Sequence, residues 1–175
     1  MKIEFISPFN IENVKLNSLV IWTDDKIRLF DKEILHLIKN EDEFLYKQFK
    51  DKRTLEKDNI LFCSGIENNI DSYIVANVYY PNNLLAIDNS IKNINKLIQY
   101  IDVVNINKLG IIKPKIKISE NKIKNNTLIY KSILIGLRKN TKLKKIYFIT
   151  EDIQEIKLIK LINFLLKIPF FNKYI

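Results

Sequence analysis

The fold is decided by the stretch 109–149, which begins with Leu-Gly-Ile-Ile at 109–112 and ends with Lys-Ile-Tyr-Phe-Ile at 145–149. Short apolar runs rich in isoleucine and bounded by polar residues are typical of buried strands. The residues between them, at 128–137, carry a helical pattern. A helix between two buried strands usually makes the strands parallel, so the stretch predicts an α/β fold.

The same alternation extends from this unit toward both ends of the chain. Further strands are expected at 2–6, 18–22, 60–63 and 73–79, and further helices at 29–39, around 91–101 and at 153–166. We expect the strand at 19–22 to be central and parallel to those at 109–112 and 145–149. The pattern predicts one α/β domain over 1–175, with a mainly parallel mixed sheet and helices on both faces.

Composition gives the chain one markedly basic segment. Isoleucine (33), lysine (26) and asparagine (21) dominate, a profile typical of A/T-rich coding, which weakens the net charge of +9 as evidence for an acidic partner. Residues 106–145 nevertheless hold twelve basic residues and one acid, or +11, whereas the remainder holds 17 basic and 19 acidic residues, or −2. The segment predicts an anionic partner, either a nucleotide or nucleic-acid phosphate.

The rare reactive side chains exclude several functional classes. Cys63 is the only cysteine and His36 the only histidine, so an intramolecular disulfide and a Cys/His zinc site are excluded. We interpret both residues as structural and expect neither a cofactor nor a metal. No apolar run approaches the ~18 residues of a spanning helix and no signal peptide is evident. We therefore expect no membrane contact and a cytoplasmic or other reducing intracellular location.

Carboxylates follow two of the expected strands, where ligands of such sheets usually bind. Asp24 and Asp25 come after the strand at 18–22, and Glu151 and Asp152 come after the last strand. Together they could hold Mg²⁺ for phosphotransfer or hydrolysis. The alternative, which we favour, is that these residues cap the helices that follow.

Three lysines alternate with apolar residues directly after the strand at 109–112. Lys113, Lys115 and Lys117 would share one face of an extended chain and could contact phosphates. Alternatively, they protect an exposed sheet edge from aggregation. Both interpretations stay open, and the stretch matches no specific nucleic-acid motif.

The order of these elements resembles the macrodomain family, whose members bind ADP-ribose or related nucleotides and sometimes hydrolyse its linkages. The resemblance covers about residues 1–149. Phe-Asn-Ile at 9–11 stands where the family has Gly-Asp-Ile, whose aspartate contacts adenine, so Asn10 would be a partial substitute. Asp24 and Asp25 stand at the family's Asn-rich loop, which lies at the distal ribose.

The chain departs from the family at both phosphate loops. Residues 26–32 contain no glycine, and Lys117 and Ser119 stand where the family has Gly-x-Gly after a proline, here Pro114. Side chains there would crowd the approach of backbone N–H groups to a diphosphate. The resemblance therefore implies a degenerate macrodomain-like module that binds ADP-ribose weakly or not at all.

These observations together predict a non-catalytic binding module for an anionic partner. The alternative is an RNA-binding or structural component of a ribonucleoprotein or other assembly, and a Mg²⁺-dependent enzyme is a third possibility. The expected ligand-binding residues are Asn10, Asp24, Asp25, Lys113, Lys115, Lys117 and Ser119.

Overall fold

The computed structural model describes residues 1–24, 60–64, 69–79, 85–112 and 122–168. The elements are β1 (Lys2–Ile6), η1 (Pro8–Asn13), β2 (Ser18–Asp24), β3 (Ile60–Ser64), β4 (Ser72–Tyr79), α3 (Leu85–Val103), β5 (Lys108–Ile112), α4 (Lys122–Lys139), β6 (Lys145–Ile149) and α5 (Ile153–Leu165). None of the helices in these ranges is long and apolar enough to span a membrane.

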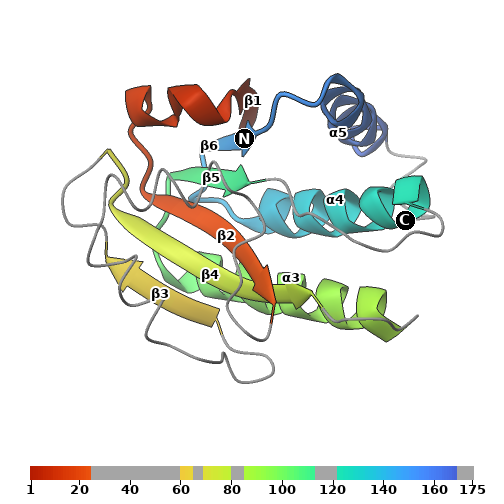
Figure 1. Ribbon diagram of the computed structural model, residues 1–175, viewed down its shortest axis with the longest axis horizontal. Coiled ribbons are helices and arrows are strands. Elements are labelled where there is room, and N and C mark those ends of the chain that lie inside the picture. The colour runs from red at the N-terminus through yellow and green to blue at the C-terminus, as the bar shows by residue number, and fades with distance from the viewer. Residues whose placement is uncertain (25–59, 65–68, 80–84, 113–121, 169–175) are drawn as a thin grey trace.

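One six-stranded sheet organises the chain, with the strand order β1-β6-β5-β2-β4-β3 (Figure 1). All neighbouring strands are parallel except β3, which pairs antiparallel with β4. β2 lies inside the sheet between β4 and β5, and it runs parallel to β5 and β6. These findings confirm the predicted mainly parallel mixed sheet and its central strand.

Side chains alternate between the two faces of the sheet because successive residues of a strand point to opposite sides. In β2, Val20 and Trp22 contribute to one hydrophobic cluster, whereas Leu19 and Ile21 contribute to the other. Strands buried on both faces have little room for polar residues. This is why β2 and its neighbours consist of nearly continuous apolar runs.

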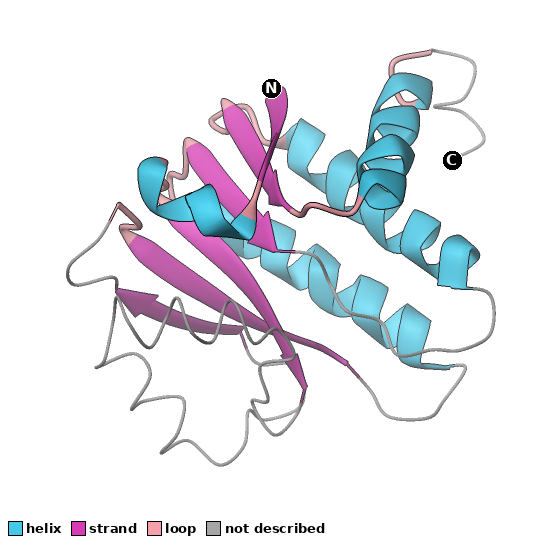
Figure 2. Cartoon of the chain, turned by 45° about the horizontal axis from the view of Figure 1, so that its top comes forward, coloured by secondary structure: helices cyan, strands magenta, loops and turns pink. Residues whose placement is uncertain are grey.

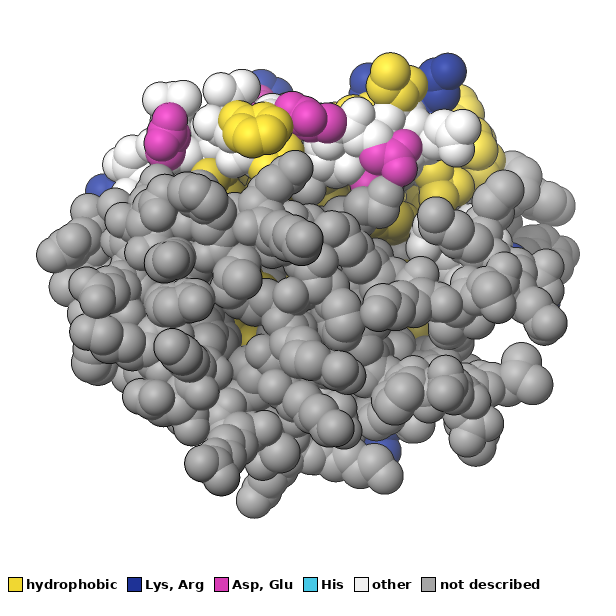
Figure 3. All heavy atoms as spheres, viewed as in Figure 1, with side chains coloured by type: hydrophobic (Ala, Val, Ile, Leu, Met, Phe, Trp, Pro, Cys, Tyr) yellow, Lys and Arg dark blue, Asp and Glu magenta, His cyan; other side chains and the backbone are white. Residues whose placement is uncertain are grey.

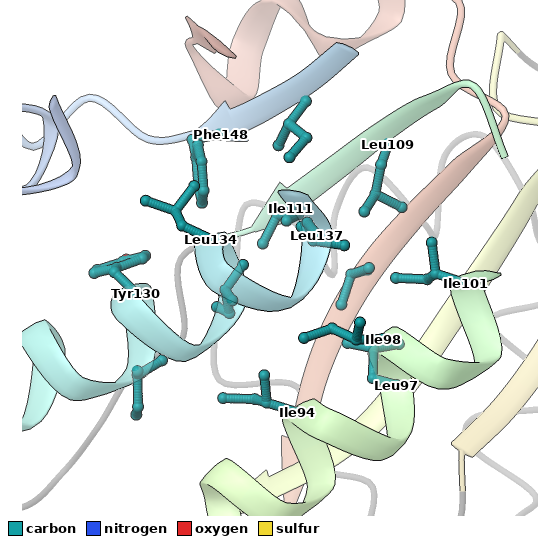
Figure 4. Packing of buried hydrophobic residues seen from close by; sticks show 14 of the residues in the cluster. Ile94, Leu97, Ile98, Ile101, Leu109, Ile111, Tyr130, Leu134, Leu137 and Phe148 are labelled. Carbon is teal, nitrogen blue, oxygen red and sulfur yellow. The ribbon is translucent and has the colours of Figure 1, made fainter. Parts of the chain in front are cut away.

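The larger cluster lies between the sheet and the helices α3, α4 and α5, which all cover the same face (Figure 2). α3 supplies an apolar stripe at helical spacing, and α4 supplies a matching one. The residues of this interface labelled in Figure 4 are Ile94, Leu97, Ile98, Ile101, Leu109, Ile111, Tyr130, Leu134, Leu137 and Phe148. Full burial of each such side chain stabilises the fold by about 1.5–3 kcal/mol, which explains why this face anchors the molecule.

The opposite face is covered, among the described residues, by η1 and the turn that follows it. Ile11 and Leu16 are completely buried there. Gly110 of β5 leaves room for this packing, because a Cβ built on it would lie 2.7 Å from a Leu16 methyl carbon and 2.8 Å from one of Leu19. The helix predicted at 29–39 lies outside the described residues.

The predicted element bounds agree best where apolar runs are sharply bounded. β1 and β6 have the predicted bounds, and α5 ends one residue before the expected 166. α4 begins at Lys122 rather than 128, because its first turns are polar and carry no hydrophobic period. α3 likewise begins at Leu85, ahead of the apolar stripe that predicted it.

Candidate functional site

The best-defined candidate site lies at the carboxyl ends of the parallel strands, between β2 and β5. The chain passes from β4 on one side of β2 to β5 on the other, through α3. Open parallel sheets bind ligands beyond the carboxyl ends of strands where the strand order reverses in this way. The carboxyl edge at β2 and β5 is therefore the first place to look for a ligand.

β2 and β5 are joined by backbone pairing over only part of their length. The ladder joins residues 18–20 to residues 109–111, while β2 continues to Asp24. Beyond the ladder, the indole Nε1 of the buried Trp22 donates to the carbonyl oxygen of Ile112 at 2.6 Å. A side chain thus links the two strands at the end of β5, immediately before the lysine-rich stretch at 113–117.

A second set of contacts joins the ends of β1 and β6, the neighbouring strands of this edge. The Thr150 N–H donates to the Ile6 carbonyl oxygen at 3.0 Å. The Ser7 hydroxyl donates to Glu151 and accepts from the Phe9 N–H at 3.2 Å, so it also caps the start of η1. η1 is therefore anchored to the loop after β6. Figure 3 shows acidic side chains along the upper margin of the molecule, where η1 and α5 lie.

The loop after β6 also fixes the start of α5. Asp152 is its N-cap and accepts from the N–H groups of Gln154 and Glu155 at 3.0 and 3.3 Å. The Thr150 hydroxyl donates to Glu155 Oε2 at 2.6 Å and accepts from the Asp152 N–H at 3.2 Å. Helix capping, the favoured interpretation, is therefore confirmed for Asp152, whereas Glu151 bonds to Ser7.

Glu155 was not predicted to take part in this edge, although it is 94 % shielded from solvent. A signal was present in the sequence, because Asp152 and Glu155 have the spacing of a capping box. The structure uses that spacing differently. The glutamate reaches Thr150 rather than closing on the backbone of the N-cap residue.

The four carboxylates considered for Mg²⁺ do not all come from neighbouring strands. β2, which ends at Asp24, and β6, which precedes Glu151, are separated by β5. Two strand spacings amount to about 10 Å, which is far for direct coordination of one ion by both ends. Among the side chains that the structure describes, no cluster of three His, Cys, Asp or Glu residues is present.

The predicted ligand-binding residues fall into two groups. Asn10 is exposed in η1, where its backbone N–H donates to the Ser7 carbonyl oxygen at 3.0 Å, and Asp24 is the last residue of β2. The others lie outside the described residues: Asp25, Lys113, Lys115, Lys117 and Ser119. The fold brings the ends of β2 and β5, from which these segments leave, to one edge.

The described basic residues of the segment 106–145 are divided between the start of β5, helix α4 and the residues that lead into β6. β5 and β6 both begin with a lysine, Lys108 and Lys145, at the amino edge of the sheet. Lys113 follows the opposite end of β5. A segment of strand, helix and strand crosses the molecule repeatedly, so its described charges do not all lie at one edge of the sheet. β5 is an internal strand with neighbours on both sides, so its described residues do not form an exposed sheet edge that lysines would need to protect.

Known proteins resemble this chain in structure rather than in sequence. By sequence, it matches no protein-family model and no curated protein. Its structure is similar to the macro domain of ganglioside induced differentiation associated protein 2, with a TM-score of 0.71, 12% identity, and coverage of 91% of this chain and 82% of that one. It is also similar to an Oceanobacillus iheyensis macrodomain with MES bound, with a TM-score of 0.62, 12% identity, and coverage of 87% and 86%.

A third similar structure is the Trypanosoma brucei macrodomain in complex with ADP-ribose. Its TM-score is 0.64 at 9% identity, and the match covers 91% of this chain and 68% of that one. Identities this low establish the fold alone. The fold of this chain is macrodomain-like.

Proposed function

We propose that this chain is a non-catalytic binding module that holds a nucleotide-type ligand at the carboxyl edge of its sheet. The observation that carries the proposal is the end of the β2–β5 ladder at the point where the strand order reverses. Such points are where open α/β sheets take nucleotides. Support comes from the similar Trypanosoma brucei macrodomain, which has been solved in complex with ADP and with ADP-ribose.

A binding role rather than catalysis is favoured by how the described carboxylates of this edge are used. A general base must have its carboxylate available to a substrate proton. Asp152 caps α5, Glu155 accepts from the Thr150 hydroxyl, and Glu151 accepts from Ser7. Each of these carboxylates has a structural partner that holds the loop in place.

Weak binding of ADP-ribose is expected from the sequence of the segments that stand where the macrodomain family has its phosphate loops. Neither 26–32 nor 114–119 contains a glycine, so backbone N–H groups cannot approach a diphosphate closely without displacing side chains. Calorimetric titration with ADP-ribose and ADP should therefore give dissociation constants weaker than the low micromolar range, and AMP, which has no diphosphate, serves as the comparison. A tighter value for ADP-ribose would contradict the expected weakening and indicate that lysine side chains replace the missing backbone donors.

The location of the ligand can be tested with two matched asparagine variants. Asn10 and Asn13 are both exposed residues of η1, so Asn10→Ala and Asn13→Ala make the same change on the same element. Only Asn10→Ala should weaken nucleotide binding. Equal effects of both variants would contradict the assignment of Asn10, and absence of saturable binding up to about 1 mM for every nucleotide would overturn the proposal.

A second candidate function is binding of nucleic acid by an assembly component. The observation that favours it is the excess of +11 within 106–145. Replacing Lys113, Lys115 and Lys117 together by Gln should then flatten the log–log dependence of RNA or DNA affinity on salt by about two to three units. An unchanged slope would remove these three lysines from the interface.

A further inference from the structure

Three neighbouring strands begin with lysines that are paired in register at the amino edge of the sheet. Lys2 of β1 pairs with Lys145 of β6, which in turn pairs with Lys108 of β5. Residues in register on parallel strands point to the same face, and neighbouring strands lie about 4.8 Å apart. The fold thus aligns three cationic side chains along one edge.

Backbone hydrogen bonds bring a fourth lysine to the same edge. The Lys144 N–H donates to the Asn107 carbonyl oxygen at 2.9 Å, and the Lys144 carbonyl oxygen accepts from the Lys2 N–H at 2.9 Å. Lys142 stands two residues earlier, in a turn held by Asn140, whose side-chain oxygen accepts from the Lys142 N–H at 2.9 Å. We call Lys2, Lys108, Lys142, Lys144 and Lys145 the amino-edge lysine cluster.

A single described carboxylate lies within this cluster. Glu4 accepts from Lys2 Nζ and Lys145 Nζ, both at 2.7 Å. Lys108 and Lys144 are exposed and have no ion pair with any residue that the structure describes. The five lysines and Glu4 therefore sum to a formal charge of +4.

Two further acids stand at the borders of the cluster. Asp71 accepts from the side-chain amide of Asn17, which neighbours Lys108, at 2.9 Å. Asp102 follows Ile101, whose carbonyl oxygen accepts from the side-chain amide of Asn140 at 3.5 Å. Like charges placed opposite each other on neighbouring strands destabilise a sheet, and one shared carboxylate offsets this only in part.

We propose that the amino-edge lysine cluster is a binding surface for the phosphate backbone of single-stranded nucleic acid. It lies at the opposite edge of the sheet from the proposed nucleotide site, and it does not depend on that site. An anionic partner would relieve the repulsion among the aligned lysines. A chain of phosphates suits a linear array of cations better than a compact anion does, because it supplies charges at successive positions.

The composition of the cluster also indicates which features of the nucleic acid it would recognise. Lysine acts on phosphate as a point charge and lacks the planar fork with which arginine recognises a guanine edge. Phosphate contacts position a nucleic acid without reading its sequence. The surface should therefore bind different sequences alike and lose affinity steeply as salt rises.

The test compares two triple variants that remove the same charge from different places. One is Lys108→Gln, Lys142→Gln and Lys144→Gln, which leaves Glu4 and its two partners intact. The control is Lys92→Gln, Lys124→Gln and Lys157→Gln, which changes exposed lysines on the three separate helices α3, α4 and α5. Fluorescence anisotropy with labelled oligouridine measures affinity between about 50 and 200 mM salt, and circular dichroism checks that each variant is folded.

Four phosphate contacts, made by Lys2, Lys108, Lys142 and Lys144, would cost wild type about 50-fold in affinity over this salt range. The cluster variant retains one of them and should lose only about 3-fold, while the control variant should behave as wild type. The cluster variant should also titrate with nucleotides as wild type does, which separates this inference from the nucleotide proposal.

Several outcomes would overturn the inference. One is absence of oligouridine binding at low salt. A second is equal flattening of the salt dependence in the control variant, which would indicate diffuse charge rather than a cluster. A third is that wild type binds polyglutamate but not oligouridine and that the cluster variant loses the polyglutamate binding. This result would make an acidic protein the partner.

Discussion

Glu4 shows at the scale of one residue how the amino edge tolerates its lysines. The pKa of the Glu4 carboxyl group is lowered mainly by the hydrogen bond from Lys145 and, to a smaller extent, by the one from Lys2. The pKa of Lys145 is raised mainly by its hydrogen bond to Glu4 and, to a smaller extent, by its interaction with Tyr147. Both shifts favour the charged forms, so the ion pair contributes to the folded state and not to the unfolded one.

Glu4→Gln should lower the stability of the protein at neutral pH, and the loss should depend on pH. Because the pKa of Glu4 is lower in the folded state, its contribution is present above the ordinary Glu value of about 4.3 and disappears as pH falls through the folded pKa. Because the pKa of Lys145 is raised, its contribution is present below about 10.4 and disappears as pH rises through the folded pKa. Thermal midpoints of wild type and variant, measured across pH, check this.

The exposed Glu12 provides the control for this measurement. Glu12→Gln removes the same charge from η1, where no described side chain pairs with Glu12. Its effect should be small at every pH. A Glu4→Gln effect that stayed constant from neutral pH down to about pH 2 would contradict the ionic origin of the stabilisation.

Gly136 of α4 lies directly against Ile98 of α3. A Cβ at position 136 would lie 2.2 Å from Ile98 Cδ1, so Gly136→Ala should destabilise by about 1–3 kcal/mol despite the higher helix propensity of alanine. Ile98→Val removes that Cδ1 atom and should cost about 0.5–1.5 kcal/mol alone. In the double variant the costs should not add, with a coupling of about 1 kcal/mol measurable by urea unfolding. Additive costs would show that the helices separate freely.

At the scale of secondary structure, the sequence predicted where strands and helices lie better than it predicted which strands pair. Polar residues bound the apolar runs of β1 and β6, so the bounds of both strands could be predicted. No sequence pattern indicates that these two strands, at opposite ends of the chain, pair with each other. The parallel order of β2, β5 and β6 was predictable because helices separate these runs. The polar first turns of α4 hid its true start at Lys122.

The sequence indicated the edge of the sheet that holds the candidate site, but it did not indicate the contacts formed there. The end of each strand follows from the apolar pattern, so residues 150–152 could be placed at the carboxyl edge. The Ser7–Glu151 bond joins residues 144 positions apart, and the Trp22 bond to Ile112 joins residues 90 apart. Local patterns contain no information on such distant pairs.

Arg138 joins two helices and gives a prediction at this scale. Its guanidinium donates to the carbonyl oxygens of Leu166 and Asn163 and to the Asn163 side chain, each at 2.8 Å, and burial lowers its pKa. Carbonyl groups at a helix end lack partners within the helix, and a cation there is favourable. Arg138→Gln should therefore destabilise the protein by about 1–3 kcal/mol in urea unfolding.

The neighbouring exposed residue on the same helix is the matched control. Lys139→Gln removes the same charge and should change stability by less than about 0.5 kcal/mol. Arg138→Lys should restore part of the loss, because lysine keeps the charge without the planar fork. Equal effects of Arg138→Gln and Lys139→Gln would show that charge alone, and not the contacts with α5, stabilises this end.

At the scale of the whole molecule, the described parts of the two sheet edges differ in charge. The amino edge collects the lysines that begin β1, β5 and β6, whereas the described loop after β6 presents Glu151 and Asp152. The split of the basic segment follows from topology, because strands enter the sheet at one edge and leave it at the other. Two ligands of different kinds could therefore occupy the molecule at once without competing.

The pairing of β1 with β6 has a consequence for synthesis of the protein. β1 is made before the other strands, yet its only described neighbour in the sheet is β6, so it stays unpaired until residues 145–149 have left the ribosome. Contacts between distant residues form slowly because closing a long loop is entropically unfavourable. In refolding followed by pulsed hydrogen exchange, the amides of β1 and β6 should become protected together and after those of α3 and α4. Until then the apolar side chains of β1 are exposed to other chains, so the protein is most prone to aggregate before residues 145–149 become available.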